Sequence, residues 1–383
     1  MTRTCIAFSA SPAVALKSTI AIACSLAACT SFADTPLGWL EGAAPSAYTL
    51  SSKQLDLTIG ALAVNDTIDF LDIRDELIAG NRRLEGDSGD LSGHNFSVQF
   101  GLASMLTAFY KQQNQDFTAQ LGDVASINLL ELDSELSTKS SHYGVRWNIY
   151  EAGHRSNDRP WHAMSLELSR IDNKSDDFSG KLDQIFLNNN TTVTFNQPQT
   201  FSVARLEDET LQAKLLYTWP MTSSITSTVF FAYSDVESES GTSSDITAPS
   251  LASAFEQRFS TDETRLHFGV GLNWQITERL PLQLSYEYID ISDSDTLIDS
   301  NPLNVLLPSF LRGSNLSQTS QDTNHVFKGS VSYWLTPKLN ISAYGTVFSN
   351  QFLGVIPHFN NPLTSSFSDE PYGYAGISIG LRL

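Results

Sequence analysis

A two-residue alternation of apolar and polar side chains limits the possible folds more than any other property of the sequence. It is clearest in residues 325–348, HVFKGSVSYWLTPKLNISAYGTVF, where apolar or aromatic residues take every second position on both sides of a turn at Pro337. Side chains of an extended chain point alternately to opposite faces, so this period predicts strands. The turn joins them into an antiparallel hairpin with one apolar face. That face would meet either the core of a soluble sandwich or lipid.

Similar segments recur and come in pairs around short turns. With the two strands of the first hairpin they make twelve, the others lying at 54–64, 94–102, 106–114, 142–150, 161–172, 209–219, 225–236, 264–276, 281–292 and 372–383. Each is close to the length of about 9 to 11 residues that crosses a bilayer as a tilted strand. Because twelve is even, both ends of the set are predicted on the same side.

The connections between these segments are unequal in length. Short turns alternate with long connections at 65–93, 115–141, 173–208, 237–263, 293–323 and 353–371. Short periplasmic turns and long extracellular loops are typical of outer-membrane barrels, whereas a soluble sandwich has no reason for this difference. The apolar face is therefore predicted to meet lipid.

Aromatic residues gather near the predicted strand ends. Five of the six tryptophans lie at the short-turn edge, and three tyrosines lie near the long connections, which predicts an aromatic girdle of Trp147, Trp161, Trp219, Trp274, Trp334, Tyr233, Tyr286 and Tyr288. Tryptophan and tyrosine prefer the boundary between lipid and water because each ring has an apolar body and a polar group. Strict alternation would turn Trp334 inward, so a β-bulge is expected beside it.

The first part of the chain has the properties of a secretory signal. Residues 1–33 combine basic residues, an apolar run and a Ser31-Phe32-Ala33 site, so they are predicted to be a signal peptide. The alternative is a lipoprotein signal with Cys29 as the lipidated residue. Residues 34–52 are expected to form a periplasmic or plugging segment, and residues 53–383 the barrel. A net charge of −19 argues against a nucleic-acid partner.

The last strand gives the chain its most specific likeness. Apolar residues alternate to the end of the sequence, at Ala375, Ile377, Ile379, Leu381 and Leu383. In this the chain resembles the Gram-negative outer-membrane β-barrel proteins. The resemblance implies an all-β fold with one transmembrane antiparallel β-barrel of about twelve strands, a place in the cell outer membrane among lipid and lipopolysaccharide, and recognition of the last strand by the barrel-assembly machinery. A terminal Leu383 departs from the aromatic residue usual in that class.

Charged residues at inward positions suggest a polar lumen. The predicted pore-lining residues are Asp56, Lys111, Arg146, Glu167, Lys214, Arg265, Glu287, Lys328 and Arg382, with His142 and His267 on the same face. Arg146, Glu167 and Lys214 are expected to form a ladder across adjacent strands, and Asp56 is expected to meet Arg382 where the barrel closes. Such a set would either select solutes by charge or brace a filled interior.

These features predict a passive, porin-like channel for small hydrophilic solutes, with no catalytic residues. The alternatives are a non-conducting barrel with structural or adhesive loops, plugged by residues 34–52 or 173–208, and an outer-leaflet lipid hydrolase. The hydrolase would use His325, which lies beside Asp322 and Thr323.

Acidic residues gather at the predicted loops and upper strand ends. The three groups are Asp72, Asp75 and Glu76; Asp235, Glu237 and Glu239; and Asp290, Asp293 and Asp295. Carboxylates of this kind can hold Ca²⁺ or Mg²⁺ that bridges to lipopolysaccharide phosphates, or they can form a solvated acidic rim. No other cofactor is expected.

Overall fold

The computed structural model describes residues 42–64, 90–118, 127–132, 135–152, 160–186, 192–246, 257–299, 323–349 and 372–383. The predicted signal peptide, including Cys29, lies outside these residues. All regular elements within them are strands. They include no helix long and apolar enough to cross a membrane.

Fourteen strands occur in the described residues. They are β1 (Leu55–Val64), β2 (Asp90–Ala103), β3 (Leu106–Thr118), β4 (Ile127–Leu132), β5 (Glu135–Ala152), β6 (His162–Ser175), β7 (Phe178–Phe186), β8 (Thr192–Pro220), β9 (Ile225–Ser244), β10 (Gln257–Thr277), β11 (Leu280–Asp299), β12 (Thr323–Thr336), β13 (Leu339–Phe348) and β14 (Tyr372–Arg382).

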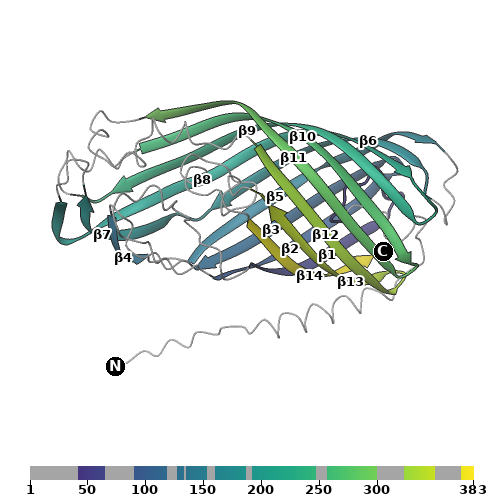
Figure 1. Ribbon diagram of the computed structural model, residues 1–383, viewed down its shortest axis with the longest axis horizontal. Coiled ribbons are helices and arrows are strands. Elements are labelled where there is room, and N and C mark those ends of the chain that lie inside the picture. The colour runs from purple at the N-terminus through teal and green to yellow at the C-terminus, as the bar shows by residue number, and fades with distance from the viewer. Residues whose placement is uncertain are drawn as a thin grey trace.

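Twelve of these strands close into a barrel (Figure 1). Every neighbouring pair is antiparallel, and the ring closes where β1 pairs with β14, with Asp56 opposite Arg382. The short turns and the end of β14 lie together at one end of the barrel, which we call the short-turn end. All twelve segments predicted from the alternation are strands of this ring, so the predicted fold is confirmed. Closure leaves no unpaired edge among strands that cross hydrocarbon, where an unpaired backbone group is costly.

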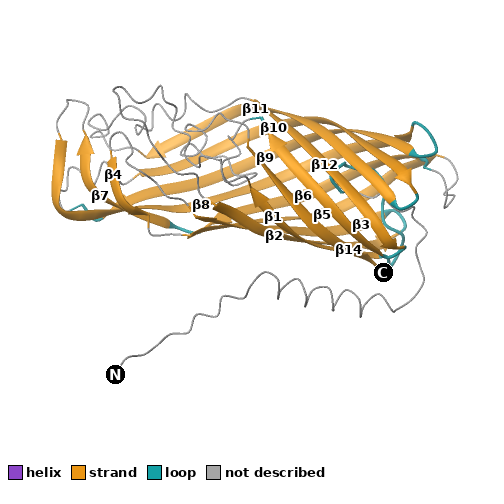
Figure 2. Cartoon of the chain, turned by 60° about the horizontal axis from the view of Figure 1, so that its bottom comes forward, coloured by secondary structure: helices purple, strands orange, loops and turns teal. Residues whose placement is uncertain are grey.

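Two strands extend the sheet beyond the barrel. β7 pairs with the first half of the 29-residue β8, and β4 pairs with β7. They project at the end opposite the short turns (Figure 2). The interpretation of 115–141 and 173–208 as loops was therefore wrong for their described parts. The suggestion that 173–208 folds into the lumen was also wrong for its described residues, because hydrogen bonds to β7 and β9 hold β8 in the sheet.

The outer face of the barrel carries large apolar side chains. We call this set the apolar belt, and its members include Ile59, Phe96, Val145, Leu168, Leu215, Phe231, Phe268, Leu284, Phe327, Ile341 and Ile377, all exposed. A water-soluble monomer rarely exposes so large a contiguous apolar surface, whereas a membrane barrel requires one.

The belt has a clear upper limit on β9. Outward positions carry Val229, Phe231 and Tyr233, and the next outward positions carry Asp235 and Glu237. Since charged side chains are costly in hydrocarbon, the strand leaves the lipid at this change and continues into water. The strands are thus longer than the membrane requires.

The predicted aromatic girdle divides into outward and inward residues. Trp147, Trp219 and Trp274 face outward near the short turns, and Tyr233, Tyr286 and Tyr288 face outward at the other edge of the belt. Trp161 and Trp334 are buried inside, each about 5% exposed or less, so their assignment to the girdle was wrong. The expected bulge is present between Trp334 and Thr336, but it follows Trp334 and does not turn that side chain outward.

Candidate functional site in the barrel lumen

The chain before β1 runs inside the barrel, near the short-turn end. We call residues 42–54 the N-terminal segment. Its backbone is held by wall side chains: Thr218 accepts a hydrogen bond from Ala47 N at 2.9 Å, and Thr107 accepts one from Leu50 N at 2.8 Å. Across the bore, the hydroxyl of Ser285 donates to the carbonyl of residue 43 at 2.8 Å. The segment therefore crosses the lumen near the short-turn end, from β11 past β8 to β3.

Tyr48 anchors this segment against the wall. Its ring lies 4.6 Å from that of Trp161, and its hydroxyl donates to the Trp161 carbonyl at 2.6 Å. The surrounding buried cluster consists of Ala47, Tyr48, Leu50, Trp161, Ala163, Leu216 and Phe230. Trp161 faces inward because it packs in this small core rather than at the lipid boundary.

Two glycines of the wall allow the segment to approach closely. A Cβ at Gly101 would lie 2.0 Å from the carbonyl oxygen of Ser51, and one at Gly271 would lie 2.8 Å from Pro45 Cδ. Both contacts are shorter than a real Cβ tolerates, so these positions require glycine if the segment is to lie where it does.

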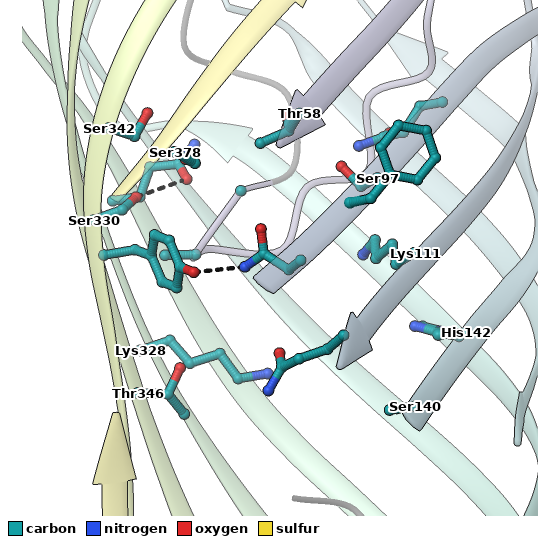
Figure 3. Close-up of a pocket in the computed structure, with 18 of the residues that line it drawn as sticks. Thr58, Ser97, Lys111, Ser140, His142, Lys328, Ser330, Ser342, Thr346 and Ser378 are labelled. Atoms are coloured by element: carbon teal, nitrogen blue, oxygen red, sulfur yellow. Dashed lines mark hydrogen bonds between the residues drawn. The ribbon is translucent and has the colours of Figure 1, made fainter. Parts of the chain in front are cut away.

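Above the N-terminal segment the lumen contains a cavity of about 450 Å³ (Figure 3). Small hydroxyl side chains form much of its wall, namely Thr58, Ser97, Ser140, Ser330, Ser332, Ser342, Thr346 and Ser378. Lys111 and His142 lie on one side of the space drawn in Figure 3, and Lys328 lies across from them. The space is polar and suits a hydrated solute.

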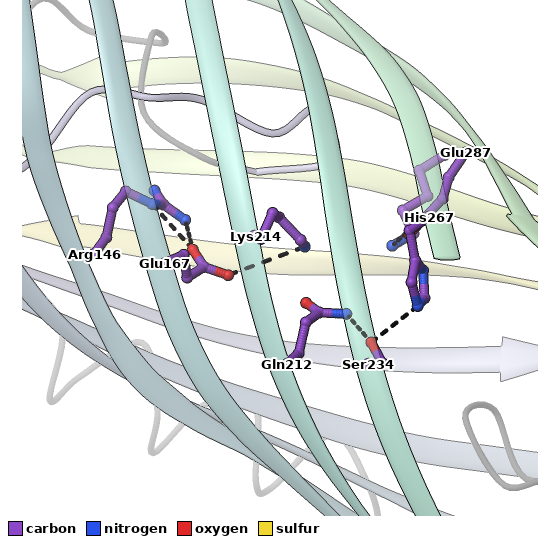
Figure 4. Close-up of polar contacts among 8 residues, drawn as sticks. Arg146, Glu167, Gln212, Lys214, Ser234, His267 and Glu287 are labelled. Atoms are coloured by element: carbon purple, nitrogen blue, oxygen red, sulfur yellow. Dashed lines mark hydrogen bonds and ion pairs between the residues drawn. The ribbon is translucent and has the colours of Figure 1, made fainter. Parts of the chain in front are cut away.

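One group of charged residues spans three adjacent strands. The guanidinium of Arg146 on β5 donates to Glu167 on β6 through both Nε, at 3.0 Å, and Nη2. Lys214 Nζ on β8 lies 4.0 Å from the other oxygen of Glu167 (Figure 4). The structure thus brings together the three residues that the alternation predicted to form a ladder.

A second polar chain runs across β8 to β12. Gln212 donates to Ser234 Oγ at 2.9 Å, Ser234 Oγ lies 3.0 Å from His267 Nε2, and His267 Nδ1 lies 2.8 Å from Glu287. Lys328 Nζ is 4.0 Å from the same carboxylate. Sequence reasoning missed Ser234, since an inward serine is common on these strands.

Ser234, His267 and Glu287 have the order and spacing of a serine-hydrolase relay. Two observations argue against that chemistry. Ser234 is 1% exposed, and it lies in the middle of β9, paired with β8 and β10 on both sides. Backbone N–H groups beside it belong to the sheet ladders and are not gathered into an oxyanion hole. We interpret this row of hydrogen bonds as a support that holds the carboxylate of Glu287 in place.

Two further ion pairs lie on the inner wall. Arg382 donates to Asp56 at 2.9 and 3.0 Å, as predicted for the closing strands, and its guanidinium lies 5.2 Å from the centre of the Trp334 ring. Trp334 therefore faces inward over a cation. Arg265 donates to Glu263 at 3.0 and 2.9 Å on the same strand.

The structure places all nine predicted pore-lining residues on the inner wall. Seven of them line the cavity, namely Asp56, Lys111, Lys214, Arg265, Glu287, Lys328 and Arg382. Arg146 and Glu167 are buried below it. Sequence reasoning missed the inward apolar residues Ile289, Val326 and Phe348, which form a second buried cluster in the lumen. The sequence did carry a signal for them, because all three fall at inward-facing positions of the two-residue alternation.

His325, the candidate for lipid hydrolysis, lies on the outer face. Its Nδ1 is 2.7 Å from the hydroxyl of Tyr286, and its ring lies 5.3 Å from that of Tyr288. Asp322 lies outside the described residues. The hydroxyl oxygen of Ser349 accepts a hydrogen bond from the backbone N–H of His325 at 3.0 Å. These contacts are those of an aromatic girdle.

The acidic groups do not form a metal site in the described part of the chain. No three His, Cys, Asp or Glu side chains come together there in an arrangement that would hold a metal ion. Asp235, Glu237 and Glu239 face outward in a row on β9. Asp72, Asp75 and Glu76 lie outside the described residues, as do the side chains of Asp293 and Asp295.

No family model matches the chain, and no curated protein matches it. Among solved structures it is similar to the translocator domain of autotransporter NalP from Neisseria meningitidis, at 9% identity over 97% of this chain and 96% of that one, with a TM-score of 0.47. It is also similar to an outer-membrane channel from Pseudomonas putida F1, at 7% identity over 87% and 96%, with a TM-score of 0.44. A FadL homologue from Pseudomonas aeruginosa matches at 12% identity over 93% and 96%, with a TM-score of 0.39.

These similarities are too low to carry a function, and the architecture rests on the strand pairing of the chain itself. A closed ring of twelve antiparallel strands with an apolar outer belt is an outer-membrane-type β-barrel. The protein lies in the outer membrane, with its short turns toward the periplasm.

Proposed function

We propose that the protein is a passive channel for small hydrophilic solutes, narrowed near its periplasmic end by the N-terminal segment. The observation that carries the proposal is the polar cavity of about 450 Å³ inside the barrel. Most of the residues in its wall carry hydroxyl, amide, imidazole or charged side chains, which suit water and polar solutes. The proposal assigns no catalytic residue.

The contrast between the two levels of the lumen supports this proposal. At the level of Tyr48 the interior is packed with apolar side chains, as in a core. Above it, the inner wall carries serines and threonines, and these leave space because their side chains are short. A barrel that served only as a rigid anchor would gain stability from filling that space as well.

A single-channel recording in a planar bilayer tests the proposal. Refolded wild-type protein is expected to give conductance steps. Ser97 faces the cavity and Val98, the next residue on β2, faces outward. Ser97→Trp fills part of the cavity, so we expect its step size to fall to roughly half or less.

Val98→Trp is the matched control, because it adds the same ring on the lipid side, and its step size should stay at the wild-type value. A folded wild-type barrel that never conducts would refute the channel. Equal conductance of the two variants would show that ions do not use this cavity.

The second candidate is a non-conducting barrel. The observation that favours it is the N-terminal segment, whose hydrogen bonds to Thr107, Thr218 and Ser285 tie it to several sides of the bore. In that case the barrel would act through the parts of its strands that extend above the membrane. Silent recordings from correctly folded protein would favour this alternative.

A further inference from the structure

Cations outnumber carboxylates among the described residues that line the cavity. Three cations have a close carboxylate of their own: Arg146 with Glu167, Arg265 with Glu263, and Arg382 with Asp56. Each of these pairs contains one charge of either sign and adds little net field at a distance.

Among the described residues that line the cavity, Lys111, Lys214 and Lys328 add three more cations, and Glu287 adds one more carboxylate. Lys214 and Lys328 both lie 4.0 Å from the nearest oxygen of a carboxylate that another group already holds at 3.0 Å or less. Counted as formal charges, the cavity wall is positive in a chain whose total charge is −19. The sign of the cavity is therefore opposite to that of the whole protein.

The three lysines line one cavity from different parts of the ring. They stand on β3, β8 and β12. The charge on Lys214 is attracted by Glu167 and Glu287 and repelled by Lys328 and Lys111. Like charges that line one cavity repel each other, and an anion between them offsets that repulsion. The ammonium of Lys111 also lies 5.3 Å from the centre of the Phe109 ring, which holds it at the wall.

The wall between the lysines offers further donors. Ser97, Ser140, Ser330 and Ser342 line the same space, and a hydroxyl can donate to an anionic oxygen. Lysine ammonium groups and hydroxyls together match the oxygens of carboxylate or phosphate groups.

We propose that this cavity binds small solutes carrying a carboxylate or phosphate group, with Lys111, Lys214 and Lys328 as the contacts, and that the channel prefers anions. The inference rests on the proposed channel and names its class of solute.

The first test is the reversal potential in a potassium chloride gradient. Wild-type channels are expected to prefer chloride. Each of Lys111→Gln, Lys214→Gln and Lys328→Gln should lower the ratio of chloride to potassium permeability, on the order of threefold per lysine. Lys214→Arg keeps the charge and should keep the preference. Lys139→Gln is the matched control, because Lys139 is exposed on β5, outside the cavity, and its permeability ratio should equal that of wild type.

The second test measures binding without conduction. Isothermal titration calorimetry of the detergent-solubilised barrel with citrate and with inorganic phosphate asks whether carboxylate or phosphate is preferred. Heat of binding for either anion that disappears in the triple Lys→Gln variant, but not in Lys139→Gln, supports the site. Circular dichroism checks that every variant retains its sheet.

The outcomes separate the two proposals. Channels that conduct but prefer potassium, or whose preference survives the triple variant, would overturn the anion site and leave the channel intact. Silent channels would defeat the proposed function, and calorimetry would still decide the site: loss of binding in the triple variant supports it, and no binding of either anion overturns it.

Discussion

Asp208 is a carboxylic acid in a position that disfavours its charge. It is 4% exposed inside the upper part of β8, above the apolar belt, between the outward-facing Glu207 and Glu209. Burial raises the pKa of Asp208 well above its ordinary value, and this outweighs the charge of Arg265 and the hydrogen bond from Asn173 Nδ2 at 2.7 Å, which both act to lower it. The acid form is therefore favoured in the folded protein.

Asp208→Asn should raise thermal stability at neutral pH. Because the pKa is raised on folding, the cost of the carboxylate is absent below the pKa of the unfolded chain, grows as the pH rises toward the folded pKa, and stays constant above it. We expect the variant to be more stable than wild type by about 1 to 2 kcal/mol at pH 8 and equal to it at pH 3. Thermal unfolding followed by circular dichroism at both pH values measures this.

A control for that experiment is Glu207→Gln, whose side chain is 44% exposed. Its effect should be small at either pH. A variant Asp208→Asn that is less stable than wild type at pH 8 would mean that the charged form of Asp208 is needed by Arg265.

At this scale the alternation predicted which side chains face inward but not how deeply they are buried. It correctly predicted that Arg146 lies opposite Glu167 and Asp56 opposite Arg382, because strand register follows from the alternation and the length of the turns. It placed Trp161 at the lipid boundary from its position near a strand end. The partner that holds it inside, Tyr48, lies 113 residues away and belongs to no strand.

Among the elements, the N-terminal segment is the one that most alters the bore. Its last two residues, Lys53 and Gln54, form backbone hydrogen bonds with Gly101 of β2. Nearer the middle of the segment, side-chain hydroxyls on β3, β6 and β8 bind its backbone. Its largest buried side chain is that of Tyr48. The attachment of the segment thus depends on a few contacts and not on a continuous ladder.

Tyr48→Ala should loosen the N-terminal segment and enlarge the conductance. Removal of a buried aromatic side chain costs about 3 to 5 kcal/mol, and here that loss falls on the contact with Trp161. We expect larger and noisier single-channel steps, together with faster cleavage near residue 48 in limited proteolysis. Tyr48→Phe keeps the ring, loses only the hydrogen bond to the Trp161 carbonyl, and should behave much more like wild type.

Unchanged step size in Tyr48→Ala, despite faster proteolysis, would show that the N-terminal segment does not limit the current.

The sequence left residues 34–52 as either a periplasmic or a plugging segment, and it did not predict which wall residues hold the part that the structure describes, for a physical reason. Residues 42–54 show neither period, since their contacts are set by the shape of the bore. The upper part of β8 was missed for a different reason. In its sequence, TVTFNQPQTFSVA, apolar residues take alternate positions at both ends, but Gln197, Pro198 and Gln199 interrupt the pattern in the middle. Proline is also rare inside strands, so the continuous alternation that marks a membrane strand is absent.

For the whole molecule, the apolar belt determines where the barrel can exist. Outward residues from Ile59 on β1 to Ile377 on β14 form one band around the ring. The band ends where β9 changes from Tyr233 to Asp235. Twelve strands, their order and this band were all predicted from the sequence, because a closed barrel in lipid repeats one simple rule on every strand.

Arginine in the belt should destabilise the barrel according to depth. Phe231→Arg replaces an outward residue within the belt and should cost about 2 to 4 kcal/mol, the cost of arginine on the lipid face deep in the bilayer. Glu237→Arg, three outward positions further along β9, lies in water and should cost little. Urea unfolding in phospholipid vesicles measures both.

Equal stability of Phe231→Arg and Glu237→Arg would place both side chains in the same solvent and would contradict a lipid-covered belt.

The seam between β1 and β14 has a consequence for how the molecule reaches this form. The ion pair of Asp56 and Arg382 joins residues 326 positions apart. This contact can stabilise the barrel only after nearly the entire polypeptide has become ordered, so spontaneous folding is slow. Until then the edges of β1 and β14 are open and can pair with other chains. The protein is therefore most vulnerable to aggregation just before the barrel closes, and it benefits from a chaperone that protects both edges until they pair.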